Sequence, residues 1–143
     1  MLIGVNEIKK NTIMGFFDKF KSQRDIVKEE LKEMNWIQLE REQQLDEIVE
    51  VSNAVPVLIF KHSTTCGISK MALRSFERAY DYDKKEIAPY FLDLKAHRDI
   101  SSAIAEKFNV QHESPQILLI KNGTAVYHTS HGAIDAESLR SKL

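Results

Sequence analysis

From residue 36 onward, two kinds of hydrophobic pattern alternate along the chain. A continuous apolar run, which is typical of a strand buried on both faces, occupies residues 56–60, and a second strand pattern follows at 116–120. Between such strands, apolar residues recur at every third or fourth position, which indicates amphipathic helices. The pattern predicts these elements in order: strand 36–39, helix 40–52, strand 56–60, helix 68–80, strand 87–94, helix 100–108, strand 116–120, strand 125–129 and a last helix over about 135–142.

Individual residues refine these elements. Asn122-Gly123 between two strands predicts a type I′ hairpin turn, because both residues tolerate positive φ. We expect Asp99 to cap the helix over 100–108. Pro89 predicts that its strand begins at a sheet edge or with a bend. In the helix over 68–80, the expected buried face repeats at every fourth residue: Ile68, Ala72, Phe76 and Tyr80.

This order of elements predicts an α/β fold. Helices that cross between strands, followed by a hairpin, build a central mixed sheet flanked by helices on both faces. We assign the domain to residues 36–143. Residues 1–35 are expected to form an N-terminal arm, partly helical or disordered, in which Ser22 caps a helix through Met34. Phe16, Phe17 and Phe20 also allow a membrane-surface segment. We favour an arm that packs on its own domain or on a partner, because acidic residues interrupt the polar face.

Composition and charge exclude several classes of protein. The 143 residues include 20 basic and 21 acidic side chains, for a net charge of −1, which argues against a nucleic-acid partner. No apolar stretch approaches about 20 residues, so no membrane span is predicted. The amino terminus lacks the basic flank and apolar core of a signal peptide, so we expect a cytoplasmic protein. A single cysteine, Cys66, excludes an intramolecular disulfide.

Cys66 lies between the strand over 56–60 and the helix over 68–80. The first N–H groups of a helix are unpaired, and together with the helix dipole they stabilise an anion such as a thiolate. Thr65 and Ser69 add hydroxyls nearby, and Lys70 adds positive charge within one turn. The alternative is a small buried cysteine with a packing role. The polar residues on both sides of Cys66 argue against that alternative.

Three features together resemble a thioredoxin fold: the alternating elements, a Cys-x-x-Ser at the helix after a central strand, and an X-Pro before the hairpin. More narrowly, residues 59–69 (IFKHSTTCGIS), followed by Ser114-Pro115-Gln116 and Lys121-Asn122-Gly123, resemble the YtxJ family of monothiol bacilliredoxins. The resemblance covers about residues 35–143 and is specific around 61–69. Members often have proline at the position of Gly67, and glycine retains an N–H that proline lacks.

The resemblance implies removal of bacillithiol from mixed disulfides on proteins. Cys66 is then the nucleophile that attacks the bacillithiol sulfur and becomes S-bacillithiolated, and an external thiol regenerates it. The implied partners are S-bacillithiolated proteins and bacillithiol as a co-substrate, with no tightly bound cofactor. Ser69 stands where a Cys-x-x-Cys protein has its second cysteine, so it can donate a hydrogen bond but cannot form a disulfide.

The expected site extends around Cys66 and includes one distant loop. Thr65, Gly67, Ile68 and Ser69 are expected to shape the anion site. By resemblance, Pro115 is the cis-proline that faces Cys66 and presents the backbone of Ser114 to the substrate. His62, at the end of its strand, and Lys70 are candidates for tuning the thiol.

Two other functions stay open. Cys66-Gly67-Ile68-Ser69 is also close to the Cys-Gly-Phe-Ser of monothiol glutaredoxins, which carry an iron–sulfur cluster between two chains. The Gly-Gly and acidic pair of those proteins are missing, and residues 131–135 match that pattern only in part. The other function is a non-catalytic thioredoxin-like interaction module that docks through the arm. No metal site is predicted, since His62 and Cys66 lie across a loop and His128 and His131 have no third ligand.

Overall fold

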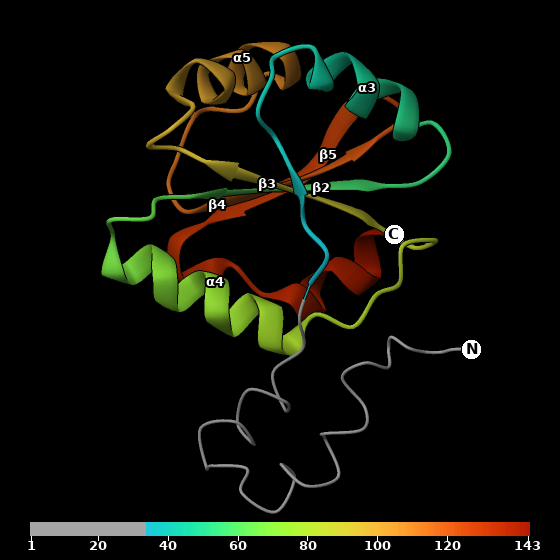
Figure 1. Cartoon of the computed structure of the whole chain (residues 1–143). Coiled ribbons are helices and arrows are strands. Elements are labelled where there is room, and N and C mark those ends of the chain that lie inside the picture. Colours follow the sequence, from blue (N-terminus) through green and yellow to red (C-terminus); the bar gives the residue numbers. More distant parts are fainter. Residues whose placement is uncertain (1–33) are drawn as a thin grey trace, which may run out of the picture. The chain divides into compact units, whose positions relative to one another are not determined.

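The structure is a computed structural model that describes residues 34–143 (Figure 1). These residues belong to one compact unit. The expected arm over 1–35 lies almost entirely outside the described residues, and so do Phe16, Phe17, Phe20 and Ser22. The arm therefore stays a prediction.

A five-stranded mixed sheet forms the centre of the described part, as the sequence predicts. Its order is β1-β3-β2-β4-β5. The pairs β1–β3 and β3–β2 are parallel, whereas β2–β4 and β4–β5 are antiparallel. The strands are β1 (Ile37–Gln38), β2 (Val57–His62), β3 (Ala88–Asp93), β4 (Gln116–Lys121) and β5 (Thr124–Ser130).

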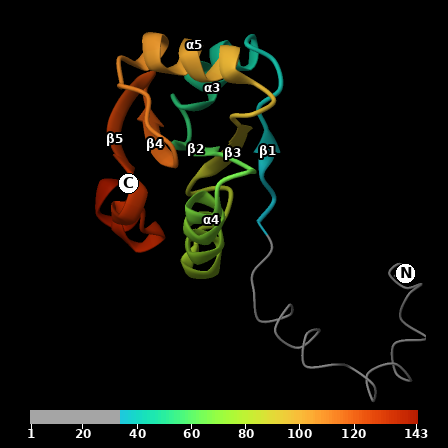
Figure 2. The ribbon, with the colours of Figure 1, turned by 90° about the vertical axis from the view of Figure 1, so that its left-hand side faces the viewer.

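Helices cover both faces of this sheet (Figures 1 and 2). On one face lie α3 (Gln44–Val51) and α5 (Arg98–Phe108), and on the other lie α4 (Gly67–Ala79) and the 3-10 helix η3 (Ala136–Lys142). A short 3-10 helix, η2 (His131–Ala133), precedes η3. The last element was predicted as a helix over about 135–142, and its type is 3-10. Its buried residues, Ala136 and Leu139, are three apart, the spacing that a 3-10 helix places on one side.

The sheet separates two hydrophobic clusters. The side chains of β2 alternate between them: Val57 and Ile59 pack under α3 and α5, and Leu58 and Phe60 pack against α4. All six residues of β2 are buried. The prediction of a central strand buried on both faces is therefore confirmed.

Three local predictions need correction. Ile68 is 69% exposed and does not belong to the buried face of α4, where Ser69 is buried instead. Asp99 lies inside the first turn of α5; His97 is the capping residue and makes no side-chain capping bond. Pro89 lies in an interior strand, not at an edge. Its neighbour Ala88 donates its N–H toward the β2 side, so the nitrogen of Pro89 faces the other side, where pairing with β1 begins only at Tyr90.

The predicted hairpin turn is present and is tied to α3. Asn122 and Gly123 have φ values of 51° and 76°. The Gly123 N–H donates to Ser52 Oγ at 2.8 Å, and the Asn122 N–H donates to the Ser52 carbonyl at 2.9 Å. Ser52 Oγ in turn donates to the carbonyl of Val49 at 2.7 Å. A single buried serine thus joins the end of α3 to the turn between β4 and β5.

We expect Ser52→Ala to lower the free energy of unfolding by about 1–3 kcal/mol, because the Gly123 N–H loses its acceptor in a half-buried place. Ser75→Ala, on the exposed side of α4, is the matched control and should change stability by less than about 0.5 kcal/mol. Urea unfolding of the three proteins measures both values. Equal stability of the two variants would contradict a structural role for the Ser52 hydroxyl.

Candidate active site

The candidate site lies at the edge of the sheet where the parallel strands β2 and β3 both end (Figure 1). In an α/β sheet, ligands bind at the carboxyl ends of the strands. The loop that carries Cys66 follows β2, and the loop that leads to α5 follows β3. The Leu94 N–H donates to the His62 carbonyl at 2.9 Å and continues the pairing one step beyond β3. The two loops therefore start side by side.

Cys66 is the amino-terminal capping residue of α4 and is half-buried. Its N–H donates to the Ser63 carbonyl at 3.2 Å, and its carbonyl accepts from the Lys70 N–H at 3.0 Å. Gly67 and Ile68 are the first two residues of the helix, so their N–H groups have no intrahelical acceptor. The predicted placement of Cys66 at a strand-to-helix turn agrees with the structure, in which its side chain accepts no capping hydrogen bond from the first turn of α4.

Ser69 anchors the loop between β2 and α4 that carries Cys66, the thiol loop. Ser69 is fully buried, its Oγ accepts from the Ser63 N–H at 3.1 Å, and its Oγ lies 2.8 Å from His62 Nδ1. His62 is itself 4% exposed at the end of β2. Burial lowers the pKa of His62; the charge of Asp93 opposes this shift and that of Lys70 adds to it. His62 is therefore neutral at pH 7, and its contact with the thiol loop runs through Ser69.

The remaining residues predicted around Cys66 are exposed. Thr65, Gly67 and Lys70 face solvent. Ile68 and Met71, exposed by 69% and 73%, form an apolar surface on the first turns of α4. Large exposed apolar side chains beside a thiol can contact a protein substrate. Met71 was not among the residues predicted near the site, since helical periodicity alone does not tell which side of an isolated helix faces the sheet.

The second loop of the site precedes β4. The Ser114–Pro115 peptide is cis, which agrees with the resemblance. Pro115 is buried, and its carbonyl accepts from the His131 N–H at 3.0 Å. The antiparallel pair Lys61–Gln116 brings the start of β4 next to the end of β2. Ser114 and Thr65 line one cavity of about 990 Å³, whose lining includes neither Cys66 nor Pro115, so the expected facing of Cys66 and Pro115 stays a prediction.

A buried lysine next to the site was not predicted. Lys61 follows the apolar run of β2 and is fully buried, and its Nζ lies 3.3 Å from Nδ1 of His112. Ser101 Oγ lies 3.1 Å from the same nitrogen. Burial lowers the pKa of Lys61 to about 8. Burial, followed by the charge of Lys61, also lowers the pKa of His112, while Glu113 opposes the shift. The unbroken strand pattern around Lys61 was the one signal that could have found it.

Comparison with known proteins decides the family. The family model described as "Monothiol bacilliredoxin BrxC" matches residues 37–139. The chain belongs to the monothiol bacilliredoxin family. This confirms the resemblance seen in residues 59–69 and 114–123.

Solved structures agree with this family. One that its authors describe as a candidate oxidoreductase with a thioredoxin fold is 35% identical, with a TM-score of 0.63, over 73% of this chain and 90% of that one. A thioredoxin of Malassezia sympodialis (20% identity, TM-score 0.58, 77% and 89% covered) and thioredoxin NaTrxh of Nicotiana alata (19%, 0.57, 78% and 91%) share the fold. The bacilliredoxin is thus an oxidoreductase of thioredoxin fold.

The described part shows neither a cluster of metal-binding side chains nor a membrane-spanning helix. Among residues 34–143, no three His, Cys, Asp or Glu side chains come together as a metal-binding group. His131 is instead paired with Glu113 at 2.7 Å. Within the same residues, no helix has the length and apolar character needed to cross a membrane.

We expect Lys61→Met to raise the free energy of unfolding at pH 7 by up to about 3 kcal/mol, because methionine fills a similar space without a buried charge. The pKa of Lys61 is about 8 in the folded protein and about 10.5 in the unfolded chain. Between these two pH values, the unfolded chain therefore binds one proton more than the folded protein does. The cost of Lys61 is therefore largest below pH 8 and fades as pH rises toward 10.5. The difference between variant and parent should shrink accordingly.

Urea unfolding at pH 7 and at pH 10 measures this difference. Lys84→Met is the control, since Lys84 is exposed and its replacement should leave a small, pH-independent effect. A Lys61→Met difference that stays constant from pH 7 to pH 10 would show that the buried ammonium is not destabilising.

Proposed function

We propose that this bacilliredoxin removes bacillithiol from S-bacillithiolated proteins, with Cys66 as the nucleophile. The observation that carries the proposal is a lone cysteine at the amino end of α4, in a chain of the monothiol bacilliredoxin family. The helix N–H groups and dipole favour the thiolate there. A lone thiol of this kind works in a reducing compartment, so we place the activity in the cytoplasm.

The reaction is a pair of thiol–disulfide exchanges, and neither needs an outside oxidant or reductant because each exchanges one disulfide for another. The Cys66 thiolate attacks the bacillithiol sulfur of the mixed disulfide. A new S–S bond forms between Cys66 and bacillithiol, the old one breaks, and the substrate protein leaves as a thiolate that takes a proton from water. An external thiol, such as a second bacillithiol, then attacks the bacillithiol bound to Cys66. This releases the Cys66 thiolate and bacillithiol disulfide, which a separate reductase must recycle.

The residues around Cys66 take distinct parts in this proposal. The N–H groups of Gly67 and Ile68 stabilise the thiolate when it attacks and when it leaves. Ser69, held by His62, fixes the loop geometry, and Lys70 adds positive charge on the next turn. Thr65 and the backbone of Ser114 and Pro115 flank the position of the incoming disulfide.

Incubation with bacillithiol disulfide should add one bacillithiol to the protein, as measured by intact mass. Cys66→Ser is the control and should stay unmodified. If the parent protein stays unmodified with bacillithiol disulfide but reacts readily with glutathione disulfide, the choice of bacillithiol as the thiol is wrong. A brown, dimeric protein after anaerobic iron–sulfur reconstitution would instead support the cluster carrier.

A second variant tests the monothiol mechanism. In Ser69→Cys, the introduced thiol should attack the mixed disulfide at Cys66, release bacillithiol and leave an intramolecular disulfide. The product mass should then fall by two hydrogens instead of rising by one bacillithiol. Ser75→Cys, on the exposed side of α4, is the control, and it should keep the adduct at Cys66. Stable bacillithiolation of Ser69→Cys would contradict the equivalence of Ser69 with the second cysteine of a Cys-x-x-Cys protein.

A further inference from the structure

The cavity beside the thiol loop brings together residues from three segments. Its walls come from the thiol loop (Ser63, Thr65), from the loop before β4 (His112, Ser114), and from the segment that runs from the end of β3 into α5 (Lys95, Arg98, Ser101, Ser102). A volume of about 990 Å³ is in the range of small-molecule sites. Cys66 does not line this cavity, but both Ser63 and Thr65 of the loop that carries it do, so the cavity begins one residue from Cys66.

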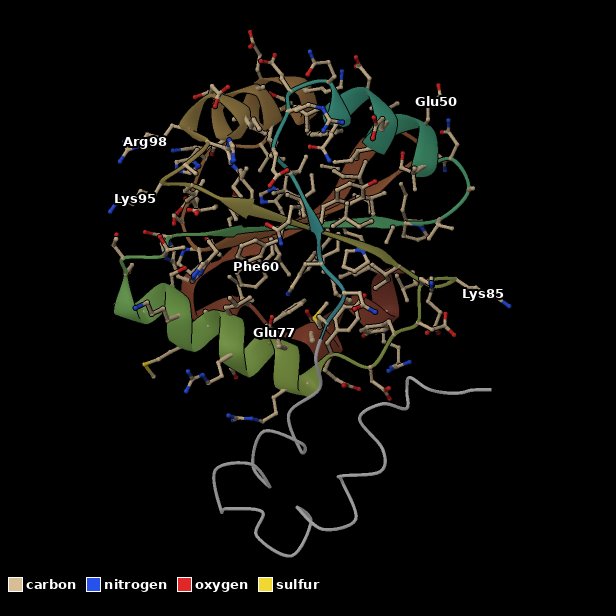
Figure 3. The ribbon with its side chains drawn as sticks, in the orientation of Figure 1. Glu50, Phe60, Glu77, Lys85, Lys95 and Arg98 are labelled. Atoms are coloured by element: carbon tan, nitrogen blue, oxygen red, sulfur yellow. The ribbon has the colours of Figure 1, made fainter. Side chains whose placement is uncertain are left out.

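Lys95 and Arg98 place two positive charges on this cavity. Lys95 follows Leu94, whose N–H is bonded to the His62 carbonyl, and Arg98 is the first residue of α5. Figure 3 shows both at the edge of the sheet where α4 begins. Neither has a carboxylate partner among residues 34–143, where the four ion pairs involve other cations. The capping residue His97 makes no side-chain capping bond. The first N–H groups of α5 therefore add partial positive charge close to Arg98.

The carboxylates closest to these two cations lie outside the cavity lining or far along it. Glu106 is the one acidic residue that lines the cavity within the described part. It is eight residues beyond Arg98 on the same helix, a separation of about 12 Å along the axis. Asp99 shares the first turn with Arg98 but does not line the cavity, and Asp93 accepts from the Lys95 N–H at 3.0 Å. Next to the thiol loop, the charged residues that line the cavity are therefore Lys95 and Arg98, while Asp93 lies beside them outside the lining.

The part-buried contact between Lys61 and His112 adds a neutral donor to the cavity wall. The protonated Lys61 can only donate, so Nδ1 of His112 is the acceptor in their 3.3 Å contact. The ring proton of the neutral His112 must then be on Nε2, which leaves an N–H donor on a residue that lines the cavity. Lys61 thereby fixes the tautomer of His112.

We propose that this cavity is a subsite for the carboxylate groups of the low-molecular-weight thiol that Cys66 exchanges with. Arg98 and Lys95 bind the carboxylates, and His112 donates from the cavity wall. Planar guanidinium groups suit carboxylates because they can form two parallel hydrogen bonds. The inference deepens the proposed function and rests on it for the identity of the thiol, although the carboxylate chemistry does not require that identity.

The double variant Lys95→Ala/Arg98→Ala tests the subsite against a charge-matched control. Lys84→Ala/Lys85→Ala removes the same charge from exposed positions, and Figure 3 shows Lys85 at the opposite edge of the sheet. The measurement is the second-order rate constant for modification of Cys66, followed by intact mass. Three disulfides serve as probes: bacillithiol disulfide and glutathione disulfide, which carry carboxylates, and bis(2-hydroxyethyl) disulfide, which is neutral.

The Lys95/Arg98 variant should react about threefold to tenfold more slowly with the two anionic disulfides, and within about twofold of the parent with the neutral one. The control should match the parent throughout. Added salt should slow the parent more than the variant with the anionic probes. An unchanged rate with the neutral probe also shows that the intrinsic reactivity of Cys66 is the same in the variant and the parent.

Two results would overturn the subsite. Equal slowing with all three disulfides would place the effect on Cys66 itself, and no slowing with the anionic probes would remove a role for the cations. Failure of the proposed function looks different. In that case the parent does not react with bacillithiol disulfide, yet the Lys95/Arg98 variant is still slowed selectively with glutathione disulfide, and the subsite stands.

Discussion

The burial of β2 along its whole length is the constraint on which the rest of the structure depends. All six residues are buried, and the strand pairs with β3 on one side and β4 on the other. Because those pairings fix the register, they also fix where three loops leave the sheet: the thiol loop, the loop into α5 and the loop before β4. The site is the place where these loops meet, so the geometry around Cys66 is a consequence of strand pairing.

The end of β2 is also unusual because its last two residues are polar and buried. Lys61 and His62 continue the strand into buried positions, where unpartnered polar groups would be costly. Each has a partner on a functional segment: Lys61 contacts His112 on the cavity wall, and His62 contacts Ser69 behind the thiol loop. The same two residues thus satisfy their own hydrogen bonds and position the walls of the site. Such buried polar contacts can specify one loop conformation more sharply than apolar packing does.

Most of the architecture was predictable because it follows from local patterns. Unbroken apolar runs, three- and four-residue spacing and Asn122-Gly123 were enough to predict the strands, two-sided burial and the hairpin. The errors occurred where local rules compete with tertiary packing. Ile68 belongs to a helical apolar repeat, yet Ser69 takes the buried position because it bonds to His62 and Ser63. Pro89 is tolerated in an interior strand because β1 is too short to reach it.

By itself, the sequence determined the α/β order, the single thiol and its place at the start of a helix, since these depend on residue type and short-range spacing. It also carried the family resemblance, because that lies in contiguous motifs. Only the tertiary structure decided which distant residues share the cavity: Lys95 and Arg98 after β3, and His112 before β4. Their convergence depends on the pairing of strands far apart in the chain, and no local pattern encodes that distance.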